Sequence, residues 1–217
     1  MTKPTLIIGN KNYSSWSLRP WLGMKAAGID FEEKLILLFD ENWKDNIAAA
    51  SPTKRVPVLV DGDLVIPESL AILEYMADKH PDKGLWPADI KARATARAAA
   101  CEMHAGFTAL RNHMPMNIRR ETPGKGMGPG VAEDVARIEQ LWGECRAKYG
   151  KDGDFLFGHF TITDAMFAPV VWRLTNFAVA VNPVSAAYME AMRTHPAMIE
   201  WADAGRAEPW TVPEDEI

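Results

Sequence analysis

The sequence predicts an α/β domain with a mixed sheet, followed by an all-α domain. Two observations support this prediction. Short apolar runs typical of strands occur only within residues 1–80, whereas residues 88–217 carry apolar side chains at helical spacing. Pro81, Gly84 and Pro87 punctuate the segment in between, which we interpret as a linker. A chain of 217 residues suits a small domain joined to a larger one.

The first domain begins with a strand, a helix and a second strand. The run TLIIG at 5–9 predicts a short buried strand, and residues 15–28 predict a helix that ends at Gly28. The run EKLILLF at 33–39 predicts the second strand. This order is that of a βαβ unit.

A hairpin and a helix complete the first domain. A polar segment at 40–52 precedes VPVLVDGDLVI at 56–66, which carries two apolar strands around Asp61-Gly62. A helix is expected from Ser69 to Lys79. The order βαβ followed by ββα predicts a mixed sheet with helices on its faces.

The second domain is expected to be helical throughout. One long helix is predicted over 88–114, where Met103, Phe107, Leu110 and Met114 repeat at helical spacing and should lie in the core. TPGKGMGPG at 122–130 is too rich in glycine to continue a helix. Further helices are predicted over 131–149, 162–178, 184–194 and 196–205.

Composition excludes several function classes. With 47% hydrophobic residues, 24% charged residues and a net charge of −5, the chain lacks the basic surface of a nucleic-acid binder. We found no secretory leader and no membrane span, so we expect a cytoplasmic protein that binds no membrane. Cys101 and Cys145 show neither CxxC spacing nor nearby histidine pairs, which predicts no metal site and two buried, inert thiols.

The stretch NYSSWSLRPW at 12–21 places Ser14, Ser15 and Ser17 between a strand and a helix. Serine is a favourable N-cap because its oxygen accepts a free N–H of the first turn. A helix N-terminus also stabilises anions. The serines are therefore interpreted either as caps or as groups that hold a bound thiolate.

Two later motifs also allow a structural and a functional interpretation. In SPTKRVPVLV, Pro57 either simply initiates a strand or follows a cis bond that leaves the Val56 backbone free to pair with an extended ligand. In PESLAILEYM, Glu68 and Ser69 open a helix. They either cap it or place its N-terminal amides around a ligand carboxylate.

Together these motifs resemble the cytosolic glutathione transferase family over nearly the whole chain. The segment SPTKRVPVLVDGDLVIPESLAILEYM is similar to the family's NP-x-x-x-VP strand, hairpin and (E/Q)-S helix start. FTITDAMFAP resembles its S/T-x-x-D capping box, in which Thr161 caps a helix and Asp164 bonds back to the Thr161 backbone. The resemblance implies a thioredoxin-like domain, then an all-helical one, with glutathione as co-substrate and no metal.

SSWSLR is most similar to the zeta class of this family, whose pattern is serine-serine-cysteine-x-x-arginine. The resemblance implies that Ser14 is the catalytic hydroxyl and that Ser15 helps to hold the glutathione sulfur. Trp16 replaces the zeta-class cysteine, which questions the zeta-class isomerase reaction but not the glutathione site. Arg19 is expected to be structural, ion-paired beneath the site.

The other glutathione contacts are carried over position by position. The resemblance implies that the Val56 backbone, with Pro57 cis, pairs with the cysteinyl part, and that Glu68 and Ser69 hold the γ-glutamyl end. The basic candidates for the glycyl carboxylate are Lys44, Lys54 and Arg55.

The second substrate is expected in a cleft between the domains. His104 and Arg111 are seven residues apart on what should be one helical face, and with Arg173 and Trp16 they are the candidate substrate contacts. Arginines in this set favour a small polar or anionic electrophile, whereas Met103, Met114 and Met116 favour an apolar one. These candidates are equally compatible with surface or core positions.

Three classes of function remain for comparison. The leading prediction is a glutathione S-transferase acting on a small electrophile, with a role in detoxification. The alternatives are a zeta-type (maleylacetoacetate) cis–trans isomerase and a noncatalytic glutathione-binding module. A glutathione-dependent oxidoreductase would need a cysteine near Ser14, where none occurs. The resemblance also implies a homodimer in which the first domain of one subunit faces the helical domain of the other.

Overall fold

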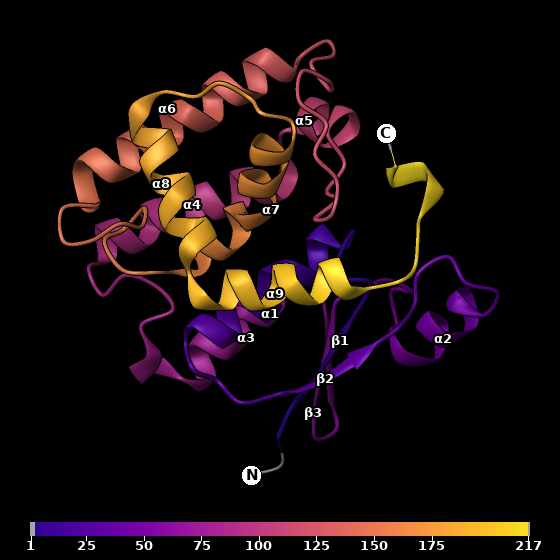
Figure 1. Cartoon of the computed structure of the whole chain (residues 1–217). Coiled ribbons are helices and arrows are strands. Elements are labelled where there is room, and N and C mark those ends of the chain that lie inside the picture. The colour runs from indigo at the N-terminus through magenta and orange to yellow at the C-terminus, as the bar shows by residue number, and fades with distance from the viewer. Residues whose placement is uncertain (1–2, 217) are drawn as a thin grey trace.

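The computed structural model describes residues 3–216, and within them every strand precedes residue 68 (Figure 1). The strands are β1 (Thr5–Ile8), β2 (Glu32–Leu35), β3 (Val58–Asp61) and β4 (Leu64–Pro67), and the first helices are α1 (Ser15–Ala26), α2 (Trp43–Ala50) and α3 (Ser69–Lys79). The sheet order is β2-β1-β3-β4, with β1 parallel to β2 and β3 antiparallel to both of its neighbours. The mixed sheet, the hairpin and the helix over 69–79 are confirmed.

Strand β1 is apolar on both faces because helices cover both sides of the sheet. Leu6 and Ile8 are fully buried in the main core, together with side chains of α1 and α3. Ile7 points to the other face and packs in a smaller cluster with Val58 and with Ile47 of α2. This arrangement gives the sequence its uninterrupted run of apolar residues.

Two details of this part differ from the sequence prediction. Strand β2 ends at Leu35, short of the predicted residue 39. Beyond it the N–H of Ile36 donates to the carbonyl of Ile8, the last residue of β1, at 2.8 Å, and the N–H of Leu38 donates to Asn10 Oδ1 at 2.7 Å. Helix α2 was not predicted. Ile47 is the only buried side chain of this helix, so its sequence shows little apolar periodicity.

The remaining helices form the second part of the molecule. They are α4 (Ile90–Ala105), α5 (Thr108–His113), α6 (Val131–Tyr149), α7 (Ile162–Asn176), α8 (Pro183–Thr194) and α9 (Pro196–Ala207), with short 3-10 turns at Pro81–Lys83 and Pro213–Asp215. The four predicted helices after residue 130 are confirmed within a few residues. No helix within residues 3–216 combines the length and the apolar character needed to cross a membrane.

The single long helix predicted over 88–114 is wrong. Helix α4 ends at Gly106, and Phe107 adopts a left-handed conformation with φ 58° before α5 begins. Met103, Phe107, Leu110 and Met114 are nevertheless all buried, as predicted. The apolar spacing continues across the break because both helices pack on the same core.

Helix α7 lies at the centre of the molecule and packs against α1, α4 and α8. Its predicted capping box is confirmed: Asp164 accepts from the N–H of Thr161 at 2.8 Å and from its hydroxyl at 2.9 Å. A Cβ at Gly23 would lie 2.5 Å from Leu73 and 3.5 Å from Ala165. Glycine at this position lets α1 approach both α3 and α7.

Helix α9 runs along the boundary between the sheet and the other helices (Figure 1). The indole of Trp201 donates to the carbonyl of Lys11 at 3.0 Å. The carboxylate of Glu208, just after α9, accepts from the N–H groups of Lys11 and Asn12 at 2.6 and 3.0 Å. The loop that leads into α1 is therefore held by residues almost two hundred positions later.

The two cysteines occupy different environments. Cys145 on α6 is buried, and burial raises the pKa of its thiol to about 12. Cys101 is exposed, which corrects the expectation that both are buried. It follows Ala100 on α4 and therefore points about 100° away from the face that Ala96, Ala100 and Met103 bury.

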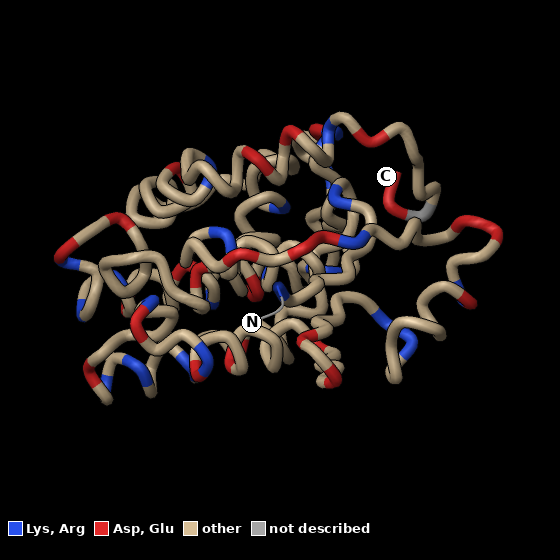
Figure 2. Tube along the Cα trace, turned by 90° about the horizontal axis from the view of Figure 1, so that it is seen from below, with Lys and Arg blue, Asp and Glu red and all other residues tan. Residues whose placement is uncertain are grey.

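Charged residues are distributed over the whole chain. Figure 2 shows acidic and basic positions interspersed along the described residues, which fits the net charge of −5.

Candidate functional site

A cavity of about 370 Å³ lies where the first part of the chain meets α4. Four segments supply its lining: the start of α1, the loop before β3, the start of α3 and the end of α4. The lining residues are Trp16, Thr53, Arg55, Val56, Pro57, Glu68, Ser69 and His104. The three motifs that the sequence singled out therefore meet at one place.

The N-terminus of α1 is capped by Ser14. Its oxygen accepts from the N–H of Ser17 at 3.4 Å, and its hydroxyl donates to Ser17 Oγ at 2.8 Å. Ser17 Oγ also accepts from the N–H of Gly9 at 3.0 Å, which joins the end of β1 to the helix. Ser14 and Ser15 are 8% and 7% exposed and immediately precede Trp16, which lines the cavity. The cap predicted from the sequence is confirmed.

Trp16 lies among three cationic or titratable side chains. The guanidinium of Arg19 is 4.1 Å from its ring centroid, that of Arg111 is 4.9 Å away, and His104 meets the ring edge-on at 5.3 Å. Arg19 is fully buried and donates from Nε to the carbonyl of Met166 at 3.2 Å. Burial lowers its pKa, and so do the neighbouring charges of Arg111 and Arg173. The wall of the cavity at Trp16 is thus electropositive.

The loop before β3 is folded by its own polar groups. Ser51 Oγ lies 3.1 Å from Thr53 Oγ1 and accepts from the N–H of Arg55 at 3.3 Å. The Val56–Pro57 peptide bond is cis, the alternative that the sequence left open. Lys54 and Arg55 are both exposed; Lys54 has a left-handed backbone, and Arg55 lines the cavity.

Glu68 combines an unusual backbone with a capping side chain. Its φ of 85° lies in a region that side-chain-bearing residues rarely occupy, and such positions cluster at binding sites. Its carboxylate accepts from the N–H groups of Ser69, Leu70 and Ala71 at 2.7, 3.1 and 3.3 Å, and from the Ser69 hydroxyl at 2.9 Å. The start of α3 therefore binds a carboxylate, but it is the chain's own. His104 Nδ1 lies 3.5 Å from Glu68 Oε1.

Comparison with known proteins identifies the family. The family model described as the N-terminal domain of glutathione S-transferase matches residues 13–79, and the C-terminal domain model matches residues 128–204. A probable maleylacetoacetate isomerase of Caenorhabditis elegans is 30% identical over 185 residues, which is 83% of each chain. The chain belongs to the glutathione S-transferase family.

Other members of the glutathione S-transferase family agree with this assignment. A glutathione S-transferase of Triticum aestivum is 38% identical over 168 residues, or 75% of each chain. The crystal structure of a glutathione transferase homologue from Burkholderia gl BGR1, with bound glutathione, superposes with a TM-score of 0.73 at 23% identity, covering 94% of this chain and 99% of that one. The thioredoxin-like sheet followed by helices is therefore the fold of the family.

Three residues predicted to contact ligands are not among the residues that line the cavity, although Arg111 contacts the ring of Trp16. Lys44 is on α2, exposed, with its Nζ over the ring of Trp43 at 5.7 Å. Arg111 does not share a helical face with His104, because α4 ends between them. The Arg111 guanidinium instead donates to the carbonyls of Met103, His104 and Gly106.

Arg173 likewise lies in the interior and does not line the cavity. It is buried and donates to the carbonyls of Met114 and Arg111. Burial lowers the pKa of Arg173 to about 10. The expected cluster of His104, Arg111 and Arg173 does not form at the cavity, where only His104 is a lining residue.

Two features of the site were missed by sequence analysis. Thr53 lines the cavity, and its position two residues before Arg55 is the only signal that could have indicated it. Arg19 stacks on Trp16 instead of forming the predicted ion pair, and its Nη1 is buried with no hydrogen-bond partner among residues 3–216. The helical spacing of Trp16 and Arg19, three residues apart, is the signal for this contact.

Proposed function

We propose that this chain binds glutathione in the 370 Å³ cavity and activates its thiol as a thiolate for addition to a small electrophile. The observation that carries the proposal is the meeting of three elements at that cavity: the α1 N-terminus, the Val56–Pro57 segment and the α3 N-terminus. In the proposed division of labour, residues 1–80 hold glutathione and residues 88–217 contribute the second-substrate site.

The reaction needs a thiolate because the thiol is a poor nucleophile. An unperturbed thiol has a pKa near ~8.5, and lowering it by about two units takes roughly 2.7 kcal/mol. A charge-assisted hydrogen bond supplies about 1.5–3 kcal/mol, and a helix N-terminus adds about 0.3–1 kcal/mol. The Ser14 hydroxyl and the α1 N-terminus therefore suffice without a general base. The buried guanidinium of Arg19 adds to the favourable field.

In this proposal the Ser14 hydroxyl hydrogen turns about the Cβ–Oγ bond from Ser17 Oγ toward the sulfur, while the oxygen still caps α1, and Ser15 assists. The peptide groups at Val56 pair with the cysteinyl part, and Glu68 and Ser69 hold the γ-glutamyl end. Because the Glu68 carboxylate already accepts the α3 amides, Glu68 attracts the γ-glutamyl ammonium group.

Among the basic candidates for the glycyl carboxylate, the structure favours Arg55. It lines the cavity, whereas Lys54 is not among the lining residues and Lys44 lies on α2. A guanidinium also matches a carboxylate with two parallel hydrogen bonds.

The test measures the thiolate directly. The ultraviolet absorbance of bound glutathione, followed against pH, should show a lowered thiol pKa in the wild type and an almost unperturbed one in Ser14→Ala, with turnover reduced and glutathione affinity within a small factor. Ser14→Thr keeps both hydroxyl and cap, and should restore activity. A crippled Ser15→Ala beside a normal Ser14→Ala would move the assignment by one residue.

The second substrate is proposed to bind beside Trp16 and His104. His104 favours a polar or anionic electrophile. Arg111 and Arg173 no longer support this preference, because their guanidinium groups donate to backbone carbonyls. The test compares KM for a carboxylated electrophile with KM for its methyl ester. A several-fold higher KM for the ester in the wild type, with no such difference in His104→Ala, supports the polar pocket. Equal KM values in the wild type rule it out.

A cis–trans isomerase is a second candidate, because a relative 30% identical to this chain is named a probable maleylacetoacetate isomerase. Glutathione-dependent isomerisation of a cis-dienoic acid, abolished by Ser14→Ala, would support it. Binding of glutathione without turnover of either substrate class would instead indicate a noncatalytic module.

We also propose a homodimer and a cytoplasmic location, with detoxification as the role. Leu64 and Val65 on the edge strand β4, and Ile90 at the start of α4, are exposed apolar side chains available to a partner subunit. Light scattering at micromolar concentration should report twice the chain mass; a monomer contradicts the dimer. The free thiols of Cys101 and Cys145 suit a reducing compartment.

A further inference from the structure

The entry loop, residues 9–14, connects β1 to α1 and ends at Ser14. Within it, the N–H of Ser14 donates to the carbonyl of Asn10 at 2.8 Å, and the N–H of Tyr13 donates to the same carbonyl at 3.2 Å. Tyr13 is 6% exposed and is not among the residues that line the proposed glutathione cavity. A contact that fixes the Tyr13 side chain therefore also fixes the backbone that leads into Ser14.

The phenol of Tyr13 has two partners from distant parts of the chain. Its hydroxyl donates to Glu216 Oε1 at 2.5 Å and accepts from Nη2 of Arg119 at 2.8 Å. Arg119 lies between α5 and α6, and Glu216 belongs to the segment 208–216, the yellow stretch that follows α9 in Figure 1. The segment after α9 therefore reaches back to the residue before Ser14.

The carboxylate of Glu216 is hydrogen-bonded at both oxygens. Oε1 also accepts from Asn117 Nδ2 at 2.9 Å, and Oε2 accepts from Arg120 Nη1 at 3.2 Å. Partial burial acts to raise the pKa of this carboxyl, but the hydrogen bonds from Tyr13, Asn117 and Arg120 hold the pKa below its ordinary value. Glu216 is therefore an anion at neutral pH, with one oxygen directed at Tyr13.

Two buried asparagines join the same groups to the entry loop. Asn12 and Asn117 are 0% and 6% exposed. Asn12 Nδ2 donates to Asn117 Oδ1 at 3.0 Å, and Asn12 Oδ1 accepts from the N–H of Arg119 at 2.9 Å. A buried polar network whose members are all paired holds a single arrangement. The entry loop, residues 117–120 and Glu216 therefore form one connected unit.

We propose that Glu216 is a positioning residue for Ser14 and acts through the Tyr13 hydroxyl, an inference that rests on the proposed function of Ser14. The carboxylate fixes Tyr13, and Tyr13 fixes the backbone from which the Ser14 hydroxyl reaches the glutathione sulfur. Glu216 is not among the residues lining the cavity, so it acts without touching the substrates. The accuracy matters, since a displacement of about 1 Å at a catalytic group costs about a hundred-fold in rate.

The sign of the effect separates positioning from electrostatics. Removing a negative charge near a thiolate favours the thiolate, and this alone would lower the pKa of the bound thiol. Loss of positioning weakens the hydrogen bond from the Ser14 hydroxyl to the sulfur, which raises that pKa. Glu216→Ala should therefore shift the thiol pKa in the direction opposite to that expected from the lost charge.

The test measures the pKa of the thiol of bound glutathione by ultraviolet absorbance, in the full chain. Glu216→Ala and Tyr13→Phe should each raise this pKa by about one, which at pH values below it means about ten-fold less thiolate. The Kd for glutathione should change little, because neither side chain lines the cavity. Glu216→Gln keeps an oxygen that accepts from Tyr13 and Asn117, so it should recover most of the wild-type pKa. An unchanged or lowered pKa in Glu216→Ala overturns the proposal.

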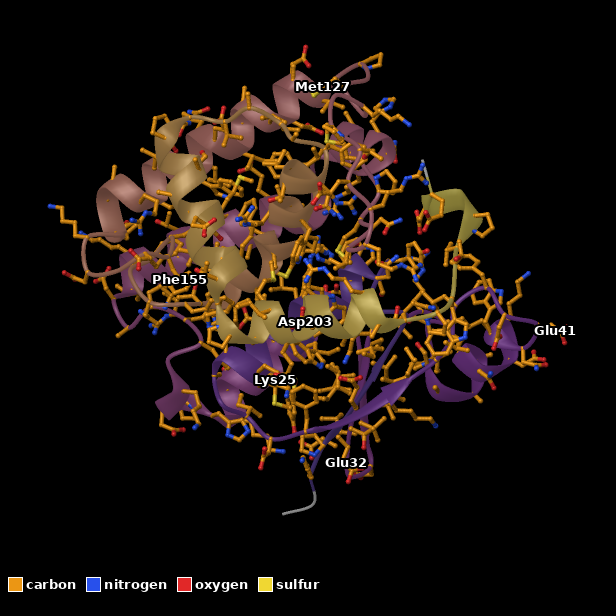
Figure 3. All side chains as sticks on the ribbon, viewed as in Figure 1. Lys25, Glu32, Glu41, Met127, Phe155 and Asp203 are labelled. Atoms are coloured by element: carbon orange, nitrogen blue, oxygen red, sulfur yellow. The ribbon has the colours of Figure 1, made fainter. Side chains whose placement is uncertain are left out.

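Glu200→Ala is the matched control. Glu200 on α9 pairs with Lys25 at 2.7 Å, and Lys25, labelled in Figure 3, lies in the last turn of α1, at the end opposite the entry loop. This variant should leave the thiol pKa unchanged. Amide hydrogen exchange of residues 13–17, measured without glutathione, should be faster in Glu216→Ala than in Glu200→Ala. Equal exchange in the two variants overturns positioning even if the thiol pKa differs.

Ser14→Ala separates this inference from the proposed function. If Ser14→Ala raises the pKa of the bound thiol and Glu216→Ala does not, the positioning role alone is wrong. If Ser14→Ala leaves that pKa unchanged, another group activates the thiol, and the role of Ser14 and the inference for Glu216 are both overturned.

Discussion

At the scale of single residues, Glu68 holds the site together more than the sequence suggested. It has a positive φ of 85°, and its carboxylate accepts hydrogen bonds from the N–H groups of Ser69, Leu70 and Ala71 in the first turn of α3. The motif allowed either a cap or a ligand carboxylate at this helix start. In the structure the side chain of Glu68 is the cap, which leaves a negative charge at the cavity wall.

Glu68→Gln should therefore weaken both the helix and the site. The amide has one acceptor oxygen in place of two, so the free energy of unfolding should fall by about 1 kcal/mol, discounted for the exposure of the side chain. KM for glutathione should rise several-fold if the charge attracts the ammonium group. Chemical denaturation and steady-state kinetics measure the two effects. Glu41→Gln changes an exposed acid that is labelled beside α2 in Figure 3 and is not among the residues lining the cavity, and it should change neither.

Glu208 gives the chain a pH-dependent contact. Burial raises the pKa of its carboxyl above the ordinary value of 4.5, although Asn12 and Lys11 N–H groups act in the opposite direction. Because the pKa of Glu208 is higher in the folded state, its contribution to the free energy of unfolding is fully present below pH 4.5 and is lost as pH rises through the folded-state pKa.

Glu208→Gln mimics the protonated carboxyl at every pH. Its stability relative to wild type should therefore improve as pH rises from below 4.5 to neutrality, as measured by denaturant unfolding at several pH values. A difference that is constant over this interval would contradict the raised pKa.

At the scale of elements, the break between α4 and α5 decides where the basic residues point. Gly106 ends α4, and a Cβ there would lie 2.8 Å from the carbonyl oxygen of Glu102. After the turn at Phe107, Arg111 folds back onto the last carbonyls of α4, which lack partners within the helix.

Arg111→Met keeps much of the packing of Arg111 but leaves those carbonyls without a donor. We expect a loss of about 1–3 kcal/mol in the free energy of unfolding. Arg111→Lys should recover only part of this, because an ammonium group lacks the planar fork. Denaturant titration distinguishes the two; a fully stable Arg111→Met would show that the contacts do not stabilise the turn.

The sequence predicted the elements better than the connections between them. Sequence analysis located the strands and helices with a strong apolar pattern, because burial of one or both faces requires apolar side chains at that spacing. A lone glycine such as Gly106 is tolerated within a helix at a cost of about 1 kcal/mol in helix stability. Its presence therefore did not indicate that the helix ends there. The partners of Arg173 and the self-capping of Glu68 depend on side-chain directions that periodicity does not encode.

At the scale of the whole molecule, the sheet and the helical part share their core. The rings of Trp21 on α1 and Trp201 on α9 are 5.1 Å apart, and Arg19 donates to the carbonyl of Met166 on α7. Such an interface should make the two parts unfold together.

We therefore expect one unfolding transition. The chain has 8 tryptophans, so the part of the fluorescence that Trp21→Phe removes reports Trp21 and the part that Trp142→Phe removes reports Trp142. Both difference signals should give the same midpoint as far-ultraviolet circular dichroism. Two midpoints, with Trp21 the earlier, would show that the sheet unfolds independently.

The hydrogen bonds from the N–H groups of Lys11 and Asn12 to Glu208 can form only after Glu208 has been synthesised. A ribosome adds roughly 5–20 residues per second, so about 10–40 s separate the appearance of this loop from that of its anchor. Throughout that interval the nascent chain carries Ser14 and Ser15, to which we assign thiol activation, next to a loop whose later partners have not yet been made. The proposed glutathione site is thus among the last parts of the protein to mature, although many of its residues are among the first to be translated.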